Sequence, residues 1–330
     1  MNNKSVGILG IGKYVPEKKV TNDDLVSMGL DTSDEWIFER TGIRSRYIVS
    51  ENETTSDLAY KAALKAVKDA SLTVDDIDMI IVATTTPDYR LFPSTAAVVQ
   101  NLLKINRPIP AFDVAAACSG FSYTLSIAEN YIKSGHYKNV LVLGADVLSK
   151  NIDWTDRTTC VLFGDGAGAV ILGEVEPEYG ILYTKLYADG SCAEILKADG
   201  GTKSPLTEGF VRDKSHFIKM NGRLVFKEAV KVIDMSIKDL LDDCCLNLSD
   251  ISYYVAHQAN MRILDYVRQK QAFKTNQVLS NIDKYGNTSA ASIPLVLDDF
   301  NHQFKKGDYI ILNAFGAGFT WGVNLIRWSK

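Results

Sequence analysis

The sequence has no uninterrupted apolar stretch approaching the ~20 residues that a membrane-spanning helix needs. Residues 1–16 hold only a short apolar run broken by glycines, without the long apolar core or the small-residue cleavage site of a signal peptide. The net charge of −4 gives no excess of positive charge for non-specific contact with nucleic acid. We therefore expect a cytoplasmic protein with no membrane and no nucleic-acid partner.

Cysteine and histidine are both scarce. The five cysteines are odd in number, scattered and without metal-ligand spacing, which favours a reducing compartment over a disulfide framework or a metal site; they are Cys118, Cys160, Cys192, Cys244 and Cys245. Three of the four histidines lie in polar, loop-like or surface-helix contexts that indicate structural roles; they are His136, His216 and His302. His257 is the histidine left to examine for chemistry.

The chain does contain enough apolar sequence for a large core. It has 330 residues, of which 46% are hydrophobic and 23% charged, as in an ordinary globular protein of one large domain or two packed halves. Apolar β-branched runs alternate with helix-period segments, so we predict an α/β fold with helices covering its sheets. The predicted strands are 78–86, 139–148, 168–175, 252–259 and 309–315, and the clearest helices are 56–70 and 226–243.

Two stretches of the sequence resemble each other. Residues 72–86 and 246–260 align without a gap, and "YIKSG" before one strand resembles "QFKKG" before another. Any two helix–strand units share some of this similarity, but the matching order of several elements favours an internal duplication. The predicted halves are 1–175 and 176–330, packed as one body.

Cys118 lies in "FDVAAACSGF", where a helical pattern of apolar residues begins. A thiol at a helix N-terminus meets the positive end of the helix dipole, which favours the reactive thiolate. The small residues around it leave room for a substrate. The alternative is a buried, inert cysteine, which is our interpretation of the other four.

Two further polar residues follow predicted strands or precede predicted helices, where sites form in α/β folds. His257 ends the strand in "VAHQANMR", and Asn287 lies in "YGNTSAAS". Each residue also has a purely structural interpretation: His257 as a buried histidine of the core, and Asn287 as a capping residue of a loop. The glycines of 313–322 can present backbone N–H groups or form a tight bend. "FGDGAGA" at 163–169 lacks the context of a dinucleotide loop, so we assign it to packing.

Taken together and in this order, "DVAAACSGF", "HQANMR", "YGNTSAAS" and "AFGAGFTWG" resemble the thiolase superfamily, and more narrowly the β-ketoacyl-acyl carrier protein synthase III family. Segments 31–46, 153–169 and 222–230 resemble the same family, so the likeness covers essentially the whole chain. The resemblance implies a duplicated five-layer α-β-α-β-α fold and a homodimer.

The resemblance also implies a reaction and its residues. Cys118 would be the nucleophile that takes an acyl group from acyl-CoA, with backbone N–H groups of Cys118 and Ala317 as the oxyanion hole. His257 and Asn287 would stabilise the enolate formed when malonyl-acyl carrier protein loses CO2. Asparagine cannot exchange a proton, which separates this set from thiolases and hydroxymethylglutaryl-CoA synthases. No metal or redox cofactor is implied.

Binding residues carry over from the same resemblance. The residues expected to bind CoA are Thr32, Trp36, Arg40, Arg157, Gly222, Phe226 and Asn260. Those expected to bind the acidic carrier protein are Lys227, Gln258, Ala259, Asn260, Met261, Arg262 and Lys270, although Lys270 fits a solvated surface equally well. Phe92 would help to close the acyl pocket of the partner subunit.

Three features depart from the family pattern. Residues 316–318 read "GAG" where many relatives have three glycines, Thr158 stands where some have glycine, and the segment 86–94 is longer than in some relatives. The last of these leaves the acyl-chain preference open.

Three other functions remain as alternatives to this condensing activity. They are a related condensing enzyme of secondary metabolism with another starter or acceptor, a non-catalytic acyl-binding subunit, and a Cys/His thioester hydrolase.

Overall fold

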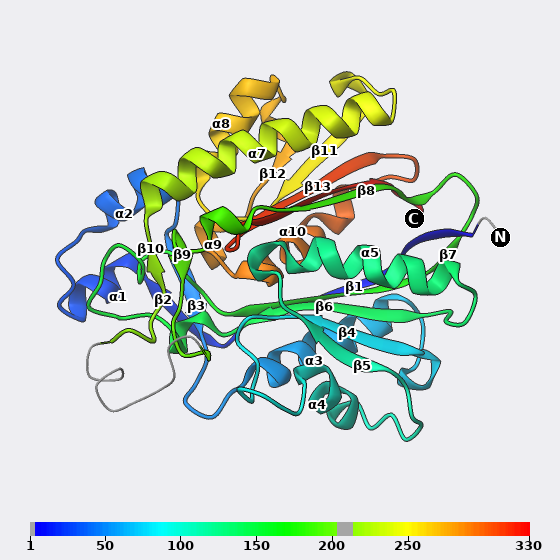
Figure 1. Ribbon diagram of the computed structural model, residues 1–330, viewed down its shortest axis with the longest axis horizontal. Helices are drawn as coiled ribbons and strands as arrows, with labels where there is room; N and C mark the ends of the chain where they lie inside the picture. The colour runs from blue at the N-terminus through cyan, green and yellow to red at the C-terminus, as the bar shows by residue number, and fades with distance from the viewer. Residues whose placement is uncertain (1–3, 203–213) are drawn as a thin grey trace.

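The computed structural model describes residues 4–202 and 214–330, and two five-stranded sheets dominate it (Figure 1). The first sheet has the strand order β1-β7-β6-β4-β5, and the second has the order β12-β11-β13-β14-β8. The strands of the first sheet are β1 Ser5–Tyr14, β4 Met79–Ala83, β5 Ala111–Val114, β6 Val140–Asp146 and β7 Gly166–Val175. Those of the second sheet are β8 Gly180–Ala188, β11 Ile251–Ala256, β12 Val278–Leu279, β13 Tyr309–Gly316 and β14 Thr320–Arg327.

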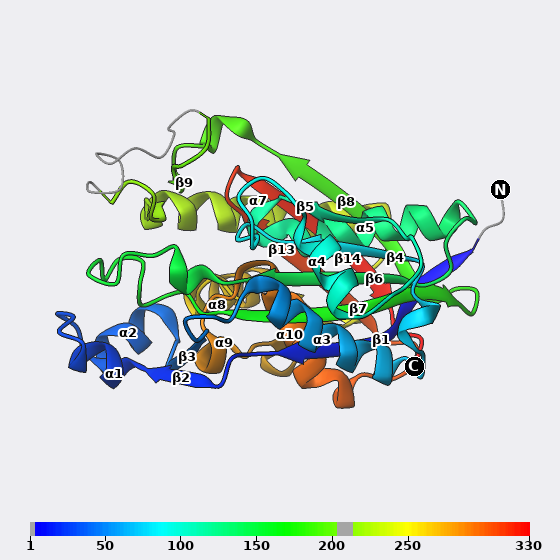
Figure 2. The same ribbon diagram turned by 90° about the horizontal axis from the view of Figure 1, so that it is seen from below.

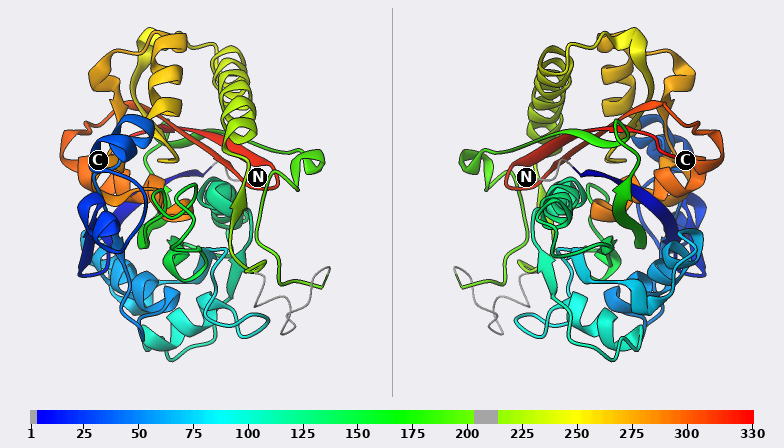
Figure 3. Two further views of the ribbon diagram at one scale, coloured as in Figure 1. Left: turned by 90° about the vertical axis from the view of Figure 1, so that its left-hand side faces the viewer. Right: turned by 90° about the vertical axis from the view of Figure 1, so that its right-hand side faces the viewer.

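Helices lie outside and between the sheets, which makes five layers (Figure 1), and the view from below shows α3 and α4 lying across the first sheet (Figure 2). The outer helices on the first sheet are α3 Thr55–Asp69 and α4 Thr95–Leu102, and those on the second are α7 Gly222–Asp243 and α8 Met261–Gln271. The central layer contains α5 Gly120–Lys133 and α10 Ser292–Phe300, with the short α9 Ile282–Tyr285 leading into it. The end-on views show the same succession of layers (Figure 3). The five-layer α/β prediction is confirmed.

The central helices are buried because their apolar residues face both sheets. On α5, Phe121, Leu125, Ala128 and Ile132 recur at helical spacing and are all fully buried in the cluster between the sheets. The neighbouring strands β4 and β6 are buried along their whole length, as expected of parallel strands covered on both faces. The loops that enter α5 and α10 are therefore held by a rigid core.

The two sheets repeat one topology. Read from β1 and from β8, each sheet has two antiparallel pairings followed by two parallel ones. The first sheet draws its strands from residues 5–175 and the second from residues 180–327. This arrangement is what an internal duplication would produce, and we propose the division into halves near residue 175 on that basis.

A smaller lobe lies at one end of the layers, at the left of Figure 1. It contains α1 Asn22–Ser27, α2 Asp34–Thr41 and the hairpin of β2 Lys18–Thr21 with β3 Ser45–Ile48. The strands β9 Leu196–Lys197 and β10 Lys219–Met220 pair with each other at the same end of the molecule, and Met220 packs against the apolar cluster of this lobe. The buried guanidinium of Arg46 holds the lobe together by donating to Asn22 Oδ1 (2.8 Å) and to the Val161 carbonyl oxygen (2.7 Å).

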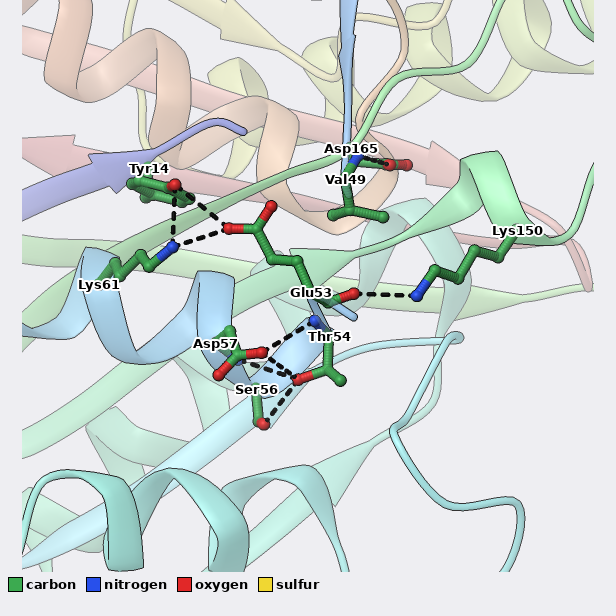
Figure 4. A network of polar contacts seen from close by, with 9 residues as sticks. All are labelled: Tyr14, Val49, Glu53, Thr54, Ser56, Asp57, Lys61, Lys150 and Asp165. Carbon is green, nitrogen blue, oxygen red and sulfur yellow. Dashed lines mark hydrogen bonds and ion pairs between the residues drawn. The ribbon is translucent and has the colours of Figure 1, made fainter. Parts of the chain in front are cut away.

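A polar network fixes the start of α3 against the segment after β6 (Figure 4). Thr54 caps the helix, and the Lys61 ammonium donates to Glu53 Oε1 (2.7 Å) and Tyr14 (2.9 Å). The Lys150 ammonium donates to the Glu53 carbonyl oxygen (2.9 Å). These bonds tie an outer helix to the loop that borders the candidate site described below.

The glycine-rich segment 163–169 serves packing, as predicted. Strand β7 begins within it, and a Cβ placed on Gly168 would lie 2.6 Å from the Cβ of Pro294 on α10. The missing side chain lets β7 and α10 pack closely.

Among the described residues, no helix combines the length and apolar character that a membrane crossing requires.

Candidate active site

Cys118 lies in a 3-10 turn, Ala117–Ser119, between the end of β5 and the first residue of α5. Ala117 has a φ of 45°, a left-handed conformation that is strained for a residue with a Cβ. Gly316, at the end of β13, approaches so closely that a Cβ there would lie 2.6 Å from the Cys118 backbone nitrogen. The thiol is therefore held where the two sheets meet.

Burial raises the pKa of the Cys118 thiol to about 12, and the Asp146 carboxylate acts in the same direction. A hydrogen bond from the Ser289 hydroxyl and the backbone N–H of Cys118 itself act in the opposite direction but are outweighed. The expectation that the helix start favours the thiolate is thus wrong for the unliganded protein. The physical reason is that α5 begins two residues later, while the sulfur itself is removed from water.

This high pKa makes a measurable prediction for the unliganded protein. Because only the thiolate reacts with iodoacetamide, the alkylation rate of Cys118 should rise about tenfold per pH unit between pH 7 and pH 9. Mass spectrometry of the peptide that contains Cys118 separates it from the other cysteines. A rate that levels off near neutral pH would contradict the burial argument.

His257 follows β11 and is buried as a neutral imidazole. Its backbone N–H donates to the Asn313 carbonyl oxygen (2.8 Å), and its Nδ1 lies 2.7 Å from Ser292 Oγ. Burial lowers its pKa to about 3 because the ring has no nearby charge to favour the imidazolium. At neutral pH the ring therefore offers one N–H donor and one lone pair.

Asn287 is fixed by backbone hydrogen bonds before α10. Its N–H donates to the Leu162 carbonyl oxygen (2.8 Å), and its own carbonyl oxygen accepts from the Gly164 N–H (3.0 Å). The side-chain Oδ1 accepts from the Ser289 N–H at 2.9 Å. Because Oδ1 is occupied, the Nδ2 donor is the group left to meet a ligand.

One cavity of about 120 Å³ brings together the three residues that the sequence placed far apart. Cys118, His257 and Asn287 all line it. Its walls also include Gly222 and Phe226 of α7 and Asn260 before α8, as expected for a tunnel that leads to the cysteine. The described residues of its wall include no acidic side chain, so a nucleophile here faces neutral hydrogen-bond donors rather than a carboxylate base.

A second cavity, of about 270 Å³, also lies beside Cys118. Its walls include Thr85 and Thr86 after β4, Ser289, and Ala317 after β13. Ala317 does not have the positive φ found at Gly318 (134°), so a Cβ at the middle of "GAG" costs no backbone strain. The alanine in "GAG" is therefore compatible with the backbone conformation of this turn.

Three of the predicted CoA residues cluster outside the tunnel, on and near α2. The guanidinium carbons of Arg40 and Arg157 lie 4.5 Å and 5.1 Å from the centre of the Trp36 ring. A planar base between Arg157 and Trp36 would need two contacts of ~3.5–4.0 Å, so Arg157 must swing outward to admit one. Its hydrogen bond to the Asp31 carbonyl oxygen (2.5 Å) holds it in the closed position.

One hydrogen bond connects this cluster to the tunnel. The Asn260 side chain donates to the Arg40 carbonyl oxygen at 3.1 Å, which links the tunnel mouth to α2. Thr32 Oγ1 is buried without a hydrogen-bond partner among the described residues, so it is free to meet a ligand. Thr158, the second departure, is exposed, and its hydroxyl donates to Asp156 Oδ1 at 2.7 Å.

The predicted docking surface for a carrier protein is smaller than expected. Lys227 on α7 and Arg262 on α8 are exposed, and they lie close in sequence to Phe226 and Asn260, which line the first cavity. The inclusion of Gln258 is wrong, because its side chain is 1% exposed and hydrogen-bonded inside the protein. Ala259 and Met261 are partly buried against apolar clusters. Lys270 is exposed but lies eight residues further along α8, about 12 Å from Arg262.

Phe92 is an exposed residue on the segment 86–94. Its side chain is 79% exposed and that of Leu91 is 80% exposed. Two adjacent apolar side chains exposed to this extent are typical of a surface that another protein covers.

The sequence reasoning missed three residues around the site. Asp146, at the end of β6, accepts hydrogen bonds from the Thr85 N–H (2.8 Å) and the Ala290 N–H (3.2 Å), which joins the two loops beside Cys118. Ser289 and Ser292 contact Cys118 and His257. Asp146 could have been predicted from the sequence, because a carboxylate at the end of a buried strand is typical of a site. Ser289 and Ser292 could not, because they lie in a run of small residues that also fits simple packing.

Comparisons with known proteins agree on one family. The profile described as 3-oxoacyl-[acyl-carrier-protein (ACP)] synthase III matches residues 112–202, and that of its C-terminal part matches residues 241–328. The β-ketoacyl-[acyl-carrier-protein] synthase III of Caldanaerobacter subterraneus subsp. tengcongensis is 50% identical over 99% of this chain and 98% of its own length.

Solved structures give the same result. The 3-oxoacyl-[acyl-carrier-protein] synthase III from Aquifex aeolicus is 45% identical, with a TM-score of 0.90 over 98% of this chain and all of its own. The priming β-ketosynthase of the R1128 polyketide biosynthetic pathway is 29% identical, with a TM-score of 0.90 over 99% of this chain and 97% of its own.

Proposed function

This chain belongs to the 3-oxoacyl-[acyl-carrier-protein] synthase III family, and from that premise we propose how its own residues carry out the condensation. The protein is an acyltransferase that joins a short acyl-CoA, most simply acetyl-CoA, to malonyl-acyl carrier protein. The products are a β-ketoacyl-acyl carrier protein, CO2 and CoA. This reaction initiates type II fatty-acid synthesis.

In the first half-reaction, the Cys118 sulfur attacks the thioester carbonyl carbon of acyl-CoA. The carbonyl oxygen gains negative charge, which the N–H groups of Cys118 and Ala317 stabilise beside the second cavity. The carbon–sulfur bond to CoA then breaks, and the departing thiolate takes the proton that Cys118 has lost. The acyl group is left on Cys118 with its chain in the second cavity.

In the second half-reaction, the malonyl thioester enters the tunnel and loses CO2. The electron pair of the broken carbon–carbon bond forms an enolate whose oxygen accepts hydrogen bonds from His257 and Asn287. The enolate carbon attacks the acyl carbon on Cys118, the bond between that carbon and the Cys118 sulfur breaks, and the departing thiolate takes up a proton from water to restore the thiol. The observation that carries this proposal is the cavity that joins one thiol to two neutral donors with no acidic residue in its described wall.

The remaining contacts extend the proposal to partners. Trp36, Arg40 and Arg157 would hold the CoA nucleotide, while Lys227 and Arg262 would meet the acidic carrier protein at the tunnel mouth. The exposed Phe92 would reach the acyl pocket of the partner in a cytoplasmic homodimer. The condensation needs neither a metal nor a redox cofactor, because both oxyanions are stabilised by N–H donors.

A second candidate is the priming of a secondary-metabolite pathway. The structural likeness to the polyketide priming enzyme favours it, although the sequence identity of 29% is well below the 45% shared with the Aquifex synthase. Both candidates use the same catalytic residues, so the acyl donor and the malonyl carrier distinguish them.

Steady-state rates with a panel of acyl-CoAs and with both malonyl carriers test the proposal. We expect a higher kcat/KM with malonyl-acyl carrier protein than with malonyl-CoA, and the acyl-CoA panel measures which chain length the second cavity of about 270 Å³ accepts best. A paired Lys227→Glu and Arg262→Glu variant should raise KM for the carrier-bound substrate and leave acylation by acyl-CoA intact. Lys270→Glu is the charge-reversal control, because Lys270 shares α8 with Arg262 but lies about 12 Å further along it. Preference for malonyl-CoA over the carrier protein would contradict the proposal.

A further inference from the structure

We propose that the Ser292 hydroxyl is a positioning group that holds His257 in the tautomer with its proton on Nε2. This inference rests on the proposed function, because it specifies which ring atom serves the enolate. The side chains concerned come from two elements that meet behind the catalytic cavity, the turn after β11 and the first residue of α10.

Ser292 lies within hydrogen-bonding distance of both His257 and its neighbour. Its Oγ is 2.7 Å from His257 Nδ1, and the side chain is 1% exposed. The Gln258 backbone N–H donates to the same Oγ at 3.3 Å. The serine oxygen therefore already accepts one hydrogen bond from a group that can only donate.

The Ser292 hydroxyl has a single hydrogen-bond acceptor to which it can donate among the described residues, His257 Nδ1. A buried hydroxyl that fails to donate loses a hydrogen bond that water would otherwise supply. The favourable arrangement is thus Oγ–H to the Nδ1 lone pair, and a neutral imidazole with its lone pair at Nδ1 carries its proton on Nε2.

The surroundings keep this geometry rigid. Gln258 Nε2 donates to the Ala256 carbonyl oxygen (2.7 Å), and its Oε1 accepts from the Ser280 hydroxyl (2.8 Å). The His257 N–H is bonded to Asn313 on the neighbouring strand. The buried side chain of Gln258 therefore makes hydrogen bonds that hold the backbone next to His257 in place.

The tautomer matters because the two ring nitrogens present opposite charges to the cavity. With Nε2 protonated, the ring offers a donor to the enolate oxygen of the second half-reaction. With Nδ1 protonated, the same ring would present a lone pair to a developing negative charge. The first half-reaction relies on backbone donors at Cys118 and Ala317, so it should not depend on the tautomer.

NMR of protein labelled with ¹⁵N-histidine tests the assignment directly. With only four histidines, the His257 signals are identified by their loss in a His257→Ala variant. We expect the wild-type ring to be protonated on Nε2, and Ser292→Ala to shift the population toward protonation on Nδ1. Ser292→Thr, which keeps the hydroxyl, should restore the wild-type pattern.

Separate rates of the two half-reactions complete the test. In Ser292→Ala, CO2 release from malonyl-acyl carrier protein should fall at least about tenfold, the effect of weakening one donor to an oxyanion, while acylation of Cys118 stays unchanged. Ser122→Ala is the matched control, because this buried serine has no hydrogen-bond partner among the described residues. It should retain the wild-type tautomer and both rates.

Two results would overturn the inference. One is a wild-type His257 protonated on Nδ1, and the other is a Ser292→Ala variant that keeps both its tautomer and its rate of CO2 release. If the proposed function failed instead, the wild-type ring would still be protonated on Nε2, but no malonyl thioester would give a carbon–carbon bond. The two failures are therefore distinguishable.

Discussion

Replacing Cys118 with serine should abolish formation of the acyl-enzyme and with it the overall condensation. A serine hydroxyl has a far higher pKa than a thiol, so it needs an adjacent base to remove its proton. His257 does not serve as that base, because the lone pair of its neutral ring, at Nδ1, already accepts a hydrogen bond from Ser292. We expect overall turnover to fall by about 10⁴-fold or more, the scale seen when a nucleophile is removed. Intact-mass spectrometry after incubation with acyl-CoA measures the acyl adduct directly.

The fold should survive this substitution, because serine is close in size to cysteine and the turn Ala117–Ser119 is held by its backbone. Cys160→Ser is the control, since Cys160 is a fully buried cysteine that lies in the apolar cluster of the smaller lobe, away from the cavity. It should keep full acylation. An undiminished adduct in Cys118→Ser would show that another residue is the nucleophile, and the loss of the adduct in Cys160→Ser would indicate a structural effect.

Replacing His257 or Asn287 with alanine should separate the two half-reactions. Each change removes one donor to the enolate oxygen, and the loss of one oxyanion donor costs about 10²–10³ in kcat. Acylation of Cys118 should survive both changes because its oxyanion is stabilised by backbone N–H groups. Release of CO2 from malonyl-acyl carrier protein measures the second step, and the mass adduct on Cys118 measures the first.

Asn287→Asp is the informative companion variant. It preserves the size of the side chain but places a negative charge beside the malonyl carboxylate and the developing enolate, which repel it. Decarboxylation should therefore fall at least as far as in Asn287→Ala. If His257→Ala and Asn287→Ala both lost acylation as well, the proposed division of labour would be refuted.

The sequence by itself determined the secondary structure that positions the site. Alternating buried strands and amphipathic helices predicted the layers, because apolar periodicity decides which face of an element avoids water. The helix over 56–70 agrees with α3 Thr55–Asp69, and the apolar spacing after Cys118 agrees with the buried face of α5. The motifs around Cys118, His257 and Asn287 also identified the family.

Only the tertiary structure decided the environment of those residues. Gln258 belongs to a motif that predicts a surface, but the packing of β11, β12 and α10 encloses it. Cys118 was expected to favour the thiolate, yet desolvation raises its pKa. Ser292 acquires a role only because α10 begins opposite His257. Burial and hydrogen bonding depend on contacts between segments far apart in the chain, and local sequence patterns do not contain those contacts.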